Sequence, residues 1–439
     1  MSRTRGFHVV VALIAVLICA VVLGACGGGG SSSGGSTAEG GSSSEEGNST
    51  TASSQSEGGQ IDAGKPPVRI PVISIKIPGL DLLTPQAAGA KAAADKINAE
   101  GGFGGREVVV EECATQLTPA TATVCANQTL AKGNVMAEVG CEVTWSSSGL
   151  KIYEKAGVPS MNCVNGTSDP GNFSGHPGAF GLQAGEAAWL CERPEIKNIV
   201  LLGQDLATQK TEEEVSTEPI IKGCGKEIHY VFAPIETTDF TPFVNKVLEY
   251  EPDFVISQQS PAPTAQMFKT FQQAGYPADQ VSVVESSCAL EETLEPAGSA
   301  MEGAYCADGF YPYTEESNPE VAAYVEAMQE NDVGYSYKSP SPPYGYSSVM
   351  WIYQGAKEIG FDKVTPEKLG EWMGSVKGKT YPLSNEWVNP GPTISSSVHQ
   401  PSTLITQWKG GTFSVVEEGT EEGWIDGFQA LEEAEKGGA

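Results

Sequence analysis

From residue 68 onward, short apolar runs alternate with longer Ala-rich stretches. Apolar runs of this length, bounded by Gly and Pro, predict strands, and the Ala-rich stretches predict helices. Thr84-Pro85 and Thr118-Pro119 each place a capping hydroxyl before a proline, which is typical of a helix start. In this first part we expect strands at 68–77, 106–112, 135–139 and 158–161, and helices at 85–99, 119–133 and 147–156.

The same alternation resumes after Gly181. Strands that alternate with helices at this spacing indicate right-handed crossovers and a parallel sheet. Two such runs predict an α/β fold with two doubly wound parallel-sheet lobes, which share the elements after Ala304. In the second run, the expected strands lie at 198–202, 228–232, 253–257 and 280–284, and the expected helices at 184–191, 213–221, 240–250 and 264–274. The later elements are a strand near 304, helices at 319–330, 344–358 and 366–375, and a hairpin at 403–416.

The N-terminal segment has the pattern of an export signal. Arg3 and Arg5 precede an apolar run, Val9–Leu23, which is short for a membrane span but suits a signal-peptide core. The run ends in Leu-Gly-Ala-Cys, which resembles the bacterial lipobox and predicts lipidation of Cys26; an uncleaved anchor is the alternative. Residues 27–64 are almost entirely Gly, Ser, Thr, Ala, Gln and Glu, a composition that predicts a disordered, flexible tether.

Composition and motifs limit the function classes. The chain has 439 residues and a net charge of −29, which argues against nucleic-acid binding. Its four His residues leave little room for a His-rich metal centre. The sequence contains no HExxH, P-loop or CxxC motif, its GxSxG match lies in the tether, and the glycines at 101–105 follow a helix rather than a strand. We therefore expect no enzyme activity, no cofactor and no metal.

The cysteines indicate disulfides, because the compartment predicted for the chain is oxidising. Cys19 leaves with the signal and Cys26 takes lipid, so an even number remains, with many pairings open. Cys113 and Cys141 follow the second and third strands, and they are a candidate pair if those strands are neighbours. Cys191–Cys224 and Cys288–Cys306 are each local in one lobe, which leaves Cys125–Cys163.

Position in the predicted sheet indicates where a ligand binds, because ligands of doubly wound sheets bind beyond the carboxyl ends of the strands. Beyond the third strand, Trp145, Ser146, Ser147 and Ser148 open a helix. Backbone N–H groups at that helix start, together with the hydroxyls, predict a cradle for a carboxylate or another anion. The alternative is that Ser146 or Ser147 only caps the helix. The polar segment 162–167, beyond the fourth strand, is a second candidate or an ordinary loop.

Five stretches occur in an order and spacing typical of one protein family: INAEGGFGGREVVVEECATQLTPATA, AEVGCEVTWSSSGLKIYEKAGVPSM, YEPDFVISQQSPAPTAQMFKTFQQAGY, AMEGAYCADGFYP and PSTLITQWKGGTF. From Val68 to about Val416, the chain thus resembles the type I periplasmic binding proteins, specifically the branched-chain amino acid and amide receptors of ABC importers. The resemblance implies two lobes that are joined by three crossover segments and close on a small ligand. The crossings would fall near Leu182–Ala184, Ala307–Tyr311 and Leu383–Gln400.

The resemblance also implies site residues. The ligand α-carboxylate would lie on the Ser-rich loop with Ser146–Ser148, and the ammonium on the loop that contains Asn165 and Thr167. A second-lobe carboxylate that pairs with the ammonium would fall near Glu285, or at 286–287 if the loop length differs. Leucine-type members bridge cysteines at positions that match Cys113 and Cys141, which supports that pair.

Two positions depart from the family pattern. The loop Gly203–Gln209 lacks the aromatic residue that the family often places there, and Pro261 replaces a ligand-contacting Tyr. Asp205 and amides such as Gln258 stand there instead. We therefore expect a small polar ligand, such as an amino acid, an amide or a related carboxylate, rather than a plain branched aliphatic one.

The predicted protein is a monomeric lipoprotein, anchored on the extracytoplasmic face of the cell membrane, that delivers its ligand to an ABC permease and ATPase. A ligand-sensing receptor with the same fold is the alternative, and a secreted hydrolase lacks a nucleophile–base pair in the sequence. The expected division is a signal peptide at 1–25, the tether at 26–65, a first lobe at 66–183 and 308–385, a second lobe at 184–307 and 386–425, and a tail at 426–439.

Overall fold

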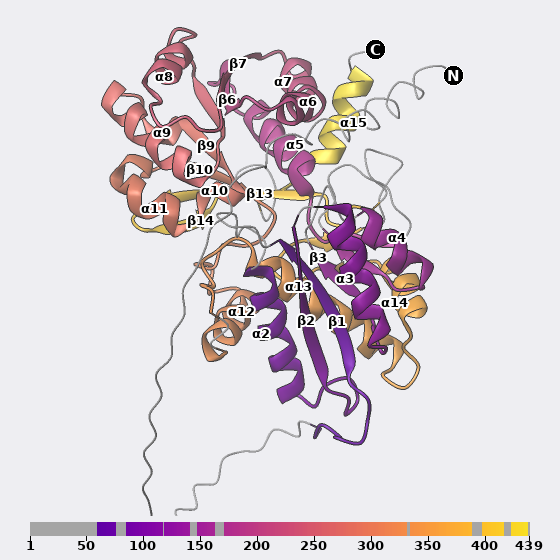
Figure 1. The fold of residues 1–439 in the computed structure, drawn as a ribbon. Helices are drawn as coiled ribbons and strands as arrows, with labels where there is room; N and C mark the ends of the chain where they lie inside the picture. Colours follow the sequence, from indigo (N-terminus) through magenta and orange to yellow (C-terminus); the bar gives the residue numbers. More distant parts are fainter. Residues whose placement is uncertain are drawn as a thin grey trace, which may run out of the picture. The chain divides into compact units, whose positions relative to one another are not determined.

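Two sheets with helices on both faces form the frame of the computed structural model, which confirms the predicted α/β class (Figure 1). The structure describes residues 59–75, 85–116, 118–140, 147–162, 171–331, 334–388, 397–416 and 423–437. These residues belong to one compact unit, Gly58–Ala439. Within these ranges, no helix has both the length and the apolar character that crossing a membrane requires.

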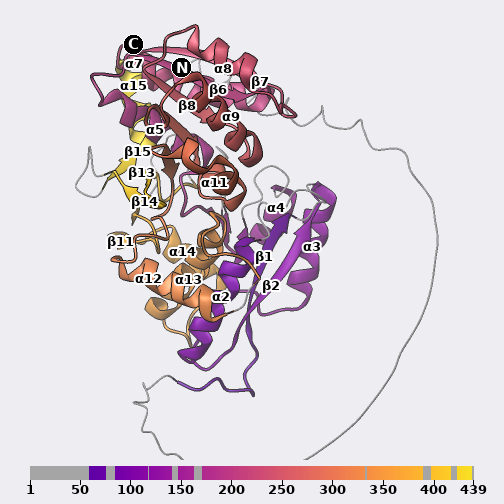
Figure 2. The same ribbon diagram turned by 90° about the vertical axis from the view of Figure 1, so that its left-hand side faces the viewer.

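The first sheet is parallel, and its strand order is β2 (Val108–Thr115), β1 (Val68–Ile75), β3 (Glu138–Gly140), β4 (Ser160–Asn162) and β5 (Asn172–Phe173). Helices α3 (Pro119–Ala131) and α4 (Ser147–Lys155) cover one face, and α2 (Pro85–Ala99), α12 (Pro319–Glu330) and α13 (Pro342–Ile359) cover the other (Figures 1 and 2). Helix α14 (Pro366–Met373) packs on α13. Thr118 caps α3 as predicted, since its hydroxyl accepts from the Thr121 amide at 3.2 Å.

Helices α2 and α13 approach each other through glycines. A Cβ atom added to Gly345 would lie far inside van der Waals contact of the Gln86 carbonyl oxygen, and one added to Gly89 would meet the Pro342 carbonyl oxygen in the same way. The neighbouring buried residues of α2 are mostly alanines, which keep the two helix axes close. This contact fixes the position of the first turn of α2.

The second sheet is parallel in its centre and antiparallel at one edge. Its order is β14 (Thr412–Val415), β13 (Ser402–Lys409), β10 (Tyr305–Asp308), β9 (Val281–Val284), β8 (Phe254–Gln258), β6 (Asn198–Gln204) and β7 (Glu227–Ala233), and β15 (Trp424–Asp426) also pairs with β13. One face carries α5 (Gly178–Cys191), α6 (Ala207–Ser216), α7 (Glu218–Gly223) and α15 (Gly427–Gly437), and the other carries α8 (Thr241–Leu248), α9 (Pro261–Ala274), α10 (Glu285–Cys288) and α11 (Glu291–Ala297).

The hydrophobic core is divided among the sheet faces. The largest cluster lies under α2, α12 and α13 and includes the buried indoles of Trp351 and Trp387. In the second sheet, Phe268 and Phe271 pack on the face of α8 and α9, and Trp189 packs on the face of α5. A separate two-stranded sheet, β11 (Lys379–Thr380) with β12 (Glu386–Trp387), follows α14.

Three described disulfides connect neighbouring segments. Cys191–Cys224 and Cys288–Cys306 are bonded as predicted. The third bond joins Cys113 to Cys125, so the predicted pairs Cys113–Cys141 and Cys125–Cys163 are wrong. The reason is the strand order, because β1 lies between β2 and β3, whereas α3 packs back on β2 and brings Cys125 to Cys113. Cys141 and Cys163 lie outside the described residues.

The described chain passes between the two sheets at 174–177 and 309–318, and a third crossing lies between β12 and β13. The first and third of these crossings are hydrogen-bonded, with the Ser174 amide donating to Ser397 and the His399 amide donating to Ser174. Leu182–Ala184, where the first crossing was expected, lie inside α5, which packs on the second sheet. The other two expected positions overlap the observed crossings.

Both ends of the body extend further than the sequence suggested. Gln60–Lys65, assigned to the tether, lie against the turn Gly101–Gly105: the Asp62 amide donates to Gly105 at 2.8 Å and Lys65 Nζ donates to Gly104 at 2.8 Å. Residues 427–437, expected only as a tail, form α15 beside α5 and α7 (Figure 1).

Candidate functional site

A cavity lies at the carboxyl ends of β3 and β4, which is where a doubly wound sheet places its ligand. Its volume is about 250 Å³, including space that is open to solvent. We call it the strand-end cavity. Its lining comes from both strands, from α2 and α13 and from the crossings: Gln86, Val139, Gly140, Met161, Ser174, Gly175, His176, Phe310, Tyr344, Ser348 and Tyr381.

Gln86 is the buried polar residue of this lining that has spare hydrogen-bonding capacity. It stands in the first turn of α2 and is fully buried. Its Nε2 donates to the Ile73 carbonyl at 2.7 Å, whereas its Oε1 has no partner among the described residues. A buried acceptor that is left unpaired costs about 1–3 kcal/mol. A ligand N–H group would remove that cost, so Gln86 is suited to accept a hydrogen bond from a ligand.

His176 joins two of the crossings. Its ring packs against those of Phe310 and Tyr344, with ring centroids 5.3 and 4.6 Å away. Nδ1 accepts from the Gly178 amide at 3.0 Å, so Nε2 carries the proton and donates to the Tyr344 hydroxyl at 3.1 Å. The imidazole therefore fixes the tyrosine hydroxyl that lines the strand-end cavity.

Tyr381 and Ser348 form the floor of the strand-end cavity. Their hydroxyl groups are 3.1 Å apart, and both residues are buried. Burial raises the pKa of the Tyr381 phenol, so this group stays protonated and can donate. The ring lies against Gly175, where an added Cβ atom would overlap it. The backbone of the first crossing at Gly175 therefore packs directly on the Tyr381 ring.

Most of the first-lobe residues predicted from sequence fall in gaps of the description. Trp145, Ser146, Asn165 and Thr167 lie outside the described residues, and so does the side chain of Ser147, whose backbone begins α4. Ser148 is described and half-buried, and its hydroxyl donates to the Pro119 carbonyl at 3.0 Å, which joins α4 to α3. The strands that lead into both loops end at the strand-end cavity, since Gly140 and Met161 line it.

At the ends of β6 and β8, neighbouring amide side chains contact Gln258, one of the second-lobe residues predicted from sequence, only through its backbone carbonyl. The Gln209 Nε2 donates to the Gln258 carbonyl at 3.0 Å, and the Gln204 Nε2 donates to the Ser260 hydroxyl at 3.1 Å. Gln258 is buried, whereas Asp205 is exposed and paired with Lys210 at 2.5 Å. Neither Asp205 nor Gln258 lines the strand-end cavity.

Glu285, the predicted partner of the ligand ammonium, opens α10 directly after β9. Its side chain lies outside the described residues. The backbone therefore places Glu285 at the carboxyl end of a second-sheet strand, and its role as a ligand partner stays a prediction.

Comparison with known families connects this geometry to a class of proteins. The model of a family described as periplasmic binding protein matches residues 78–403. The chain belongs to the periplasmic binding protein family. This is a family of extracytoplasmic binding proteins rather than enzymes, and the resemblance inferred from the sequence is confirmed.

Solved structures of the same fold agree with this assignment. An ABC transporter substrate-binding protein from Sphaerobacter thermophilus matches with a TM-score of 0.67 and 20% identity, over 83% of this chain and 99% of that one. A leucine-binding protein from Thermotoga maritima matches with a TM-score of 0.61 and 18% identity, over 82% of this chain and 99% of that one. A solute-binding protein from R. palustris in complex with 4-hydroxybenzoate matches with a TM-score of 0.63 and 17% identity, over 82% of this chain and 97% of that one. No curated protein sequence matches the chain.

Sequence reasoning missed several lining residues of this periplasmic binding protein, namely Gln86, His176, Tyr344, Ser348 and Tyr381. Gln86 carries the clearest signal, because it follows the Thr84-Pro85 helix start beyond the first strand. The strand-end rule that selected Ser148 would have selected it as well. The other four come from a crossing, from α13 and from a segment after α14, and periodicity alone does not place those segments at the strand ends.

Proposed function

We propose that this periplasmic binding protein captures a small polar ligand, namely an amino acid, an amide or a related carboxylate, for an ABC importer. Capture occurs at the strand-end cavity, and the ligand is delivered to a membrane permease with its ATPase. The family supports this function, as do solved structures of the same fold that are described as ABC transporter components.

The observation that carries the proposal is Gln86, a lining residue of the strand-end cavity whose buried Oε1 has no partner among the described residues. Around it stand the hydroxyls of Ser348, Tyr344 and Tyr381. One unpaired acceptor and several hydroxyls favour a ligand with N–H donors and an acceptor. An ammonium or amide group meets this requirement, and a purely aliphatic molecule does not.

Delivery depends on the crossings. Binding shifts a population of open and closed arrangements about the crossings toward the closed one, which the permease recognises. The crossings act together, because Ser174 is hydrogen-bonded to the third crossing and His176 packs on Phe310 of the second.

A lipid on Cys26 would hold the protein at the membrane. The support is the Leu-Gly-Ala-Cys sequence after an apolar run and the Gly/Ser-rich segment that follows it. Two or more acyl chains give lasting attachment, whereas one chain is marginal. We expect the N-terminal peptide of the membrane-extracted protein to begin at Cys26 and to carry acyl chains by mass spectrometry. A Cys26→Ala variant should leave the membrane fraction, and membrane retention of that variant would contradict the anchor.

Titration calorimetry with a panel of amino acids, amides and small carboxylates tests the ligand class. At least one polar member is expected to bind with micromolar or tighter affinity, which corresponds to about −8 kcal/mol. Tight binding of leucine with indifference to every polar member would contradict the proposed class. Absence of binding by the whole panel would contradict the function itself.

Replacement of Gln86 tests the site. We expect Gln86→Leu to weaken binding of the best panel ligand by about tenfold or more, near 1.4 kcal/mol, because the ligand donor loses its acceptor. The measurement is the dissociation constant by calorimetry. Gln272→Leu is the matched control, since Gln272 is exposed on α9 and does not line the strand-end cavity. Equal affinity in the Gln86→Leu and Gln272→Leu proteins would place the site elsewhere.

A further inference from the structure

A second cavity lies beside the second crossing and has a different chemical lining. Its volume is about 460 Å³, including space that is open to solvent. We call it the aromatic cavity, because its walls include Phe310, Tyr313, Tyr324, Tyr337, Phe413 and Pro340. Phe310 also lines the strand-end cavity, so the two cavities are neighbours on this ring.

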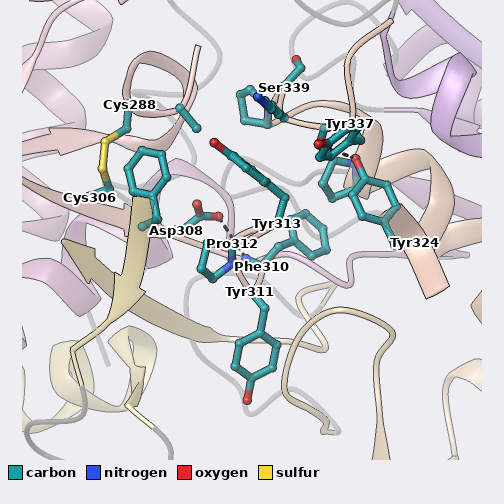
Figure 3. Close-up of a pocket in the computed structure, with 15 residues that line it drawn as sticks. Cys288, Cys306, Asp308, Phe310, Tyr311, Pro312, Tyr313, Tyr324, Tyr337 and Ser339 are labelled. Carbon is teal, nitrogen blue, oxygen red and sulfur yellow. Dashed lines mark hydrogen bonds between the residues drawn. A yellow bond between two sulfur atoms is a disulfide. The ribbon is translucent and has the colours of Figure 1, made fainter. Parts of the chain in front are cut away.

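Tyr313 is held in place by other rings. Figure 3 shows it between the Cys288–Cys306 disulfide on one side and Tyr337 with Tyr324 on the other. It packs edge-on against Tyr337, with centroids 5.7 Å apart, and against Phe413 at 6.4 Å. Edge-to-face pairs of this kind are favourable arrangements of aromatic rings.

The rings around Tyr313 are also fixed. The Tyr324 hydroxyl donates to the Tyr337 carbonyl at 2.9 Å, and the Thr314 hydroxyl donates to the Phe413 carbonyl at 2.6 Å. Phe310 packs edge-on against Tyr344, with centroids 5.0 Å apart. The walls are therefore preorganised, and a ligand that enters them does not pay to order these side chains.

The polar groups on these walls are the Asp308 carboxylate, the Lys338 ammonium and the hydroxyls of Ser339, Tyr311, Tyr313, Tyr324 and Tyr337. The Asp308 carboxylate accepts from the Phe310 amide at 3.1 Å, and Lys338 Nζ lies 6.0 Å from the ring centroids of both Tyr313 and Tyr337. The strand-end cavity differs in that it presents the Gln86 amide and fewer aromatic rings. A ligand ring therefore meets more aromatic side chains in the aromatic cavity, and a ligand N–H group finds the unpaired Gln86 acceptor on the side of the strand-end cavity.

We infer that the aromatic cavity is the part of the binding site that receives an aromatic ring of the ligand, so that the ligand class narrows to ring-bearing amino acids or carboxylates. This inference rests on the proposed function. A planar ring gains face and edge contacts with Tyr313, Phe310 and Phe413 that an aliphatic group of similar size does not gain. The polar head of the same ligand lies toward the Gln86 side of Phe310.

Calorimetric titration of the purified protein with L-phenylalanine, L-leucine and L-asparagine tests this subsite. L-phenylalanine is expected to bind about tenfold or more tightly than the other two. In Tyr313→Leu and in Phe413→Leu, this preference is expected to fall below about threefold, because each variant removes one ring contact. Two variants are used because either one alone could disturb folding, which circular dichroism of each protein checks.

Tyr335→Leu is the matched control, since Tyr335 is exposed and does not line the aromatic cavity; its preference should equal that of the unaltered protein. The inference alone is overturned if asparagine or another polar ligand without a ring binds as tightly as phenylalanine, and the proposed function then still stands; tight binding of leucine with indifference to asparagine overturns the proposed ligand class as well. The inference is also overturned if the preference survives in both folded variants. Absence of binding by every ligand overturns the inference and the proposed function together.

Discussion

Gly345→Ala should destabilise the protein by about 1–3 kcal/mol or more, because the added methyl group has no space. It would overlap the Gln86 carbonyl oxygen and approach the Ala90 amide, both of which are backbone atoms of α2. Backbone atoms cannot rotate away as a side chain can, so the whole of α2 must shift. The measurement is the free energy of unfolding from urea titration followed by circular dichroism.

The same substitution should also weaken ligand binding, since Gln86 lines the strand-end cavity from the first turn of α2. Gly370→Ala is the matched control, because Gly370 is also helical and its added Cβ atom would make only ordinary contact, 3.6 Å from Pro159. Alanine at that position should be neutral or stabilising by roughly 0.5–1 kcal/mol. If both variants unfold at the same urea concentration, the close approach of α2 and α13 does not limit stability.

Stability should fall as pH rises from about 5 to about 9, because two carboxyl groups are buried on the α5 face of the second sheet. Burial raises the pKa of Glu213 to about 8 and that of Glu186 to about 7, from an ordinary value of 4.5. Glu186 and Glu212 raise the pKa of Glu213 further, and the hydrogen bond from Thr217 opposes the shift. One oxygen of each buried carboxyl has no partner among the described residues.

The direction of this change in stability follows from the number of protons that the folded and unfolded states bind. Both folded-state pKa values lie above the unfolded value, so the folded protein binds more protons at neutral pH. Their effect on stability is absent below about pH 4.5, and a penalty grows as pH rises through about 7 and 8. Each unit of pKa shift is worth roughly 1.4 kcal/mol, so the total change is on the order of several kcal/mol.

Urea titrations of the unaltered protein and of Glu213→Gln across this pH range measure the effect. The variant should lose much of the dependence on pH and should be the more stable protein at pH 9. Glu214→Gln is the matched control, since Glu214 is the next residue and is exposed. If the free energy of unfolding depends on pH in the same way for Glu213→Gln and the unaltered protein, then ionisation of Glu213 in the folded state does not lower stability.

The regular elements were predictable because burial leaves a periodic trace in the sequence. Strands such as β8 and β6 are continuous apolar runs, and the helix start at Thr118-Pro119 was correct. The short strands β5, β11 and β12 have two residues each, which is too few for a period to show. Helix α11 was missed as well, and it contains Pro296.

The sequence-based predictions are wrong where the structure depends on which helices and strands become neighbours. Cys113 was paired with Cys141 on the assumption that consecutive strands adjoin, whereas β1 is inserted between them. The start of α5 was placed six residues late, because Gly178 and Gly181 are poor helix formers and tertiary packing overrides that preference. The lining residues His176 and Tyr381 are brought together by the crossings, which no local pattern encodes.

The docking of Gln60–Lys65 on the turn Gly101–Gly105 has a practical consequence. That turn connects the end of α2 to the start of β2, and it therefore lies at the amino edge of the first sheet, whereas the strand-end cavity lies at the carboxyl edge. The chain thus enters the body at the edge of the first sheet opposite to the strand-end cavity, where we propose that the solute binds. Immobilisation through the N-terminus on a sensor chip should leave this cavity accessible, and a fusion partner placed there should not compete with the solute.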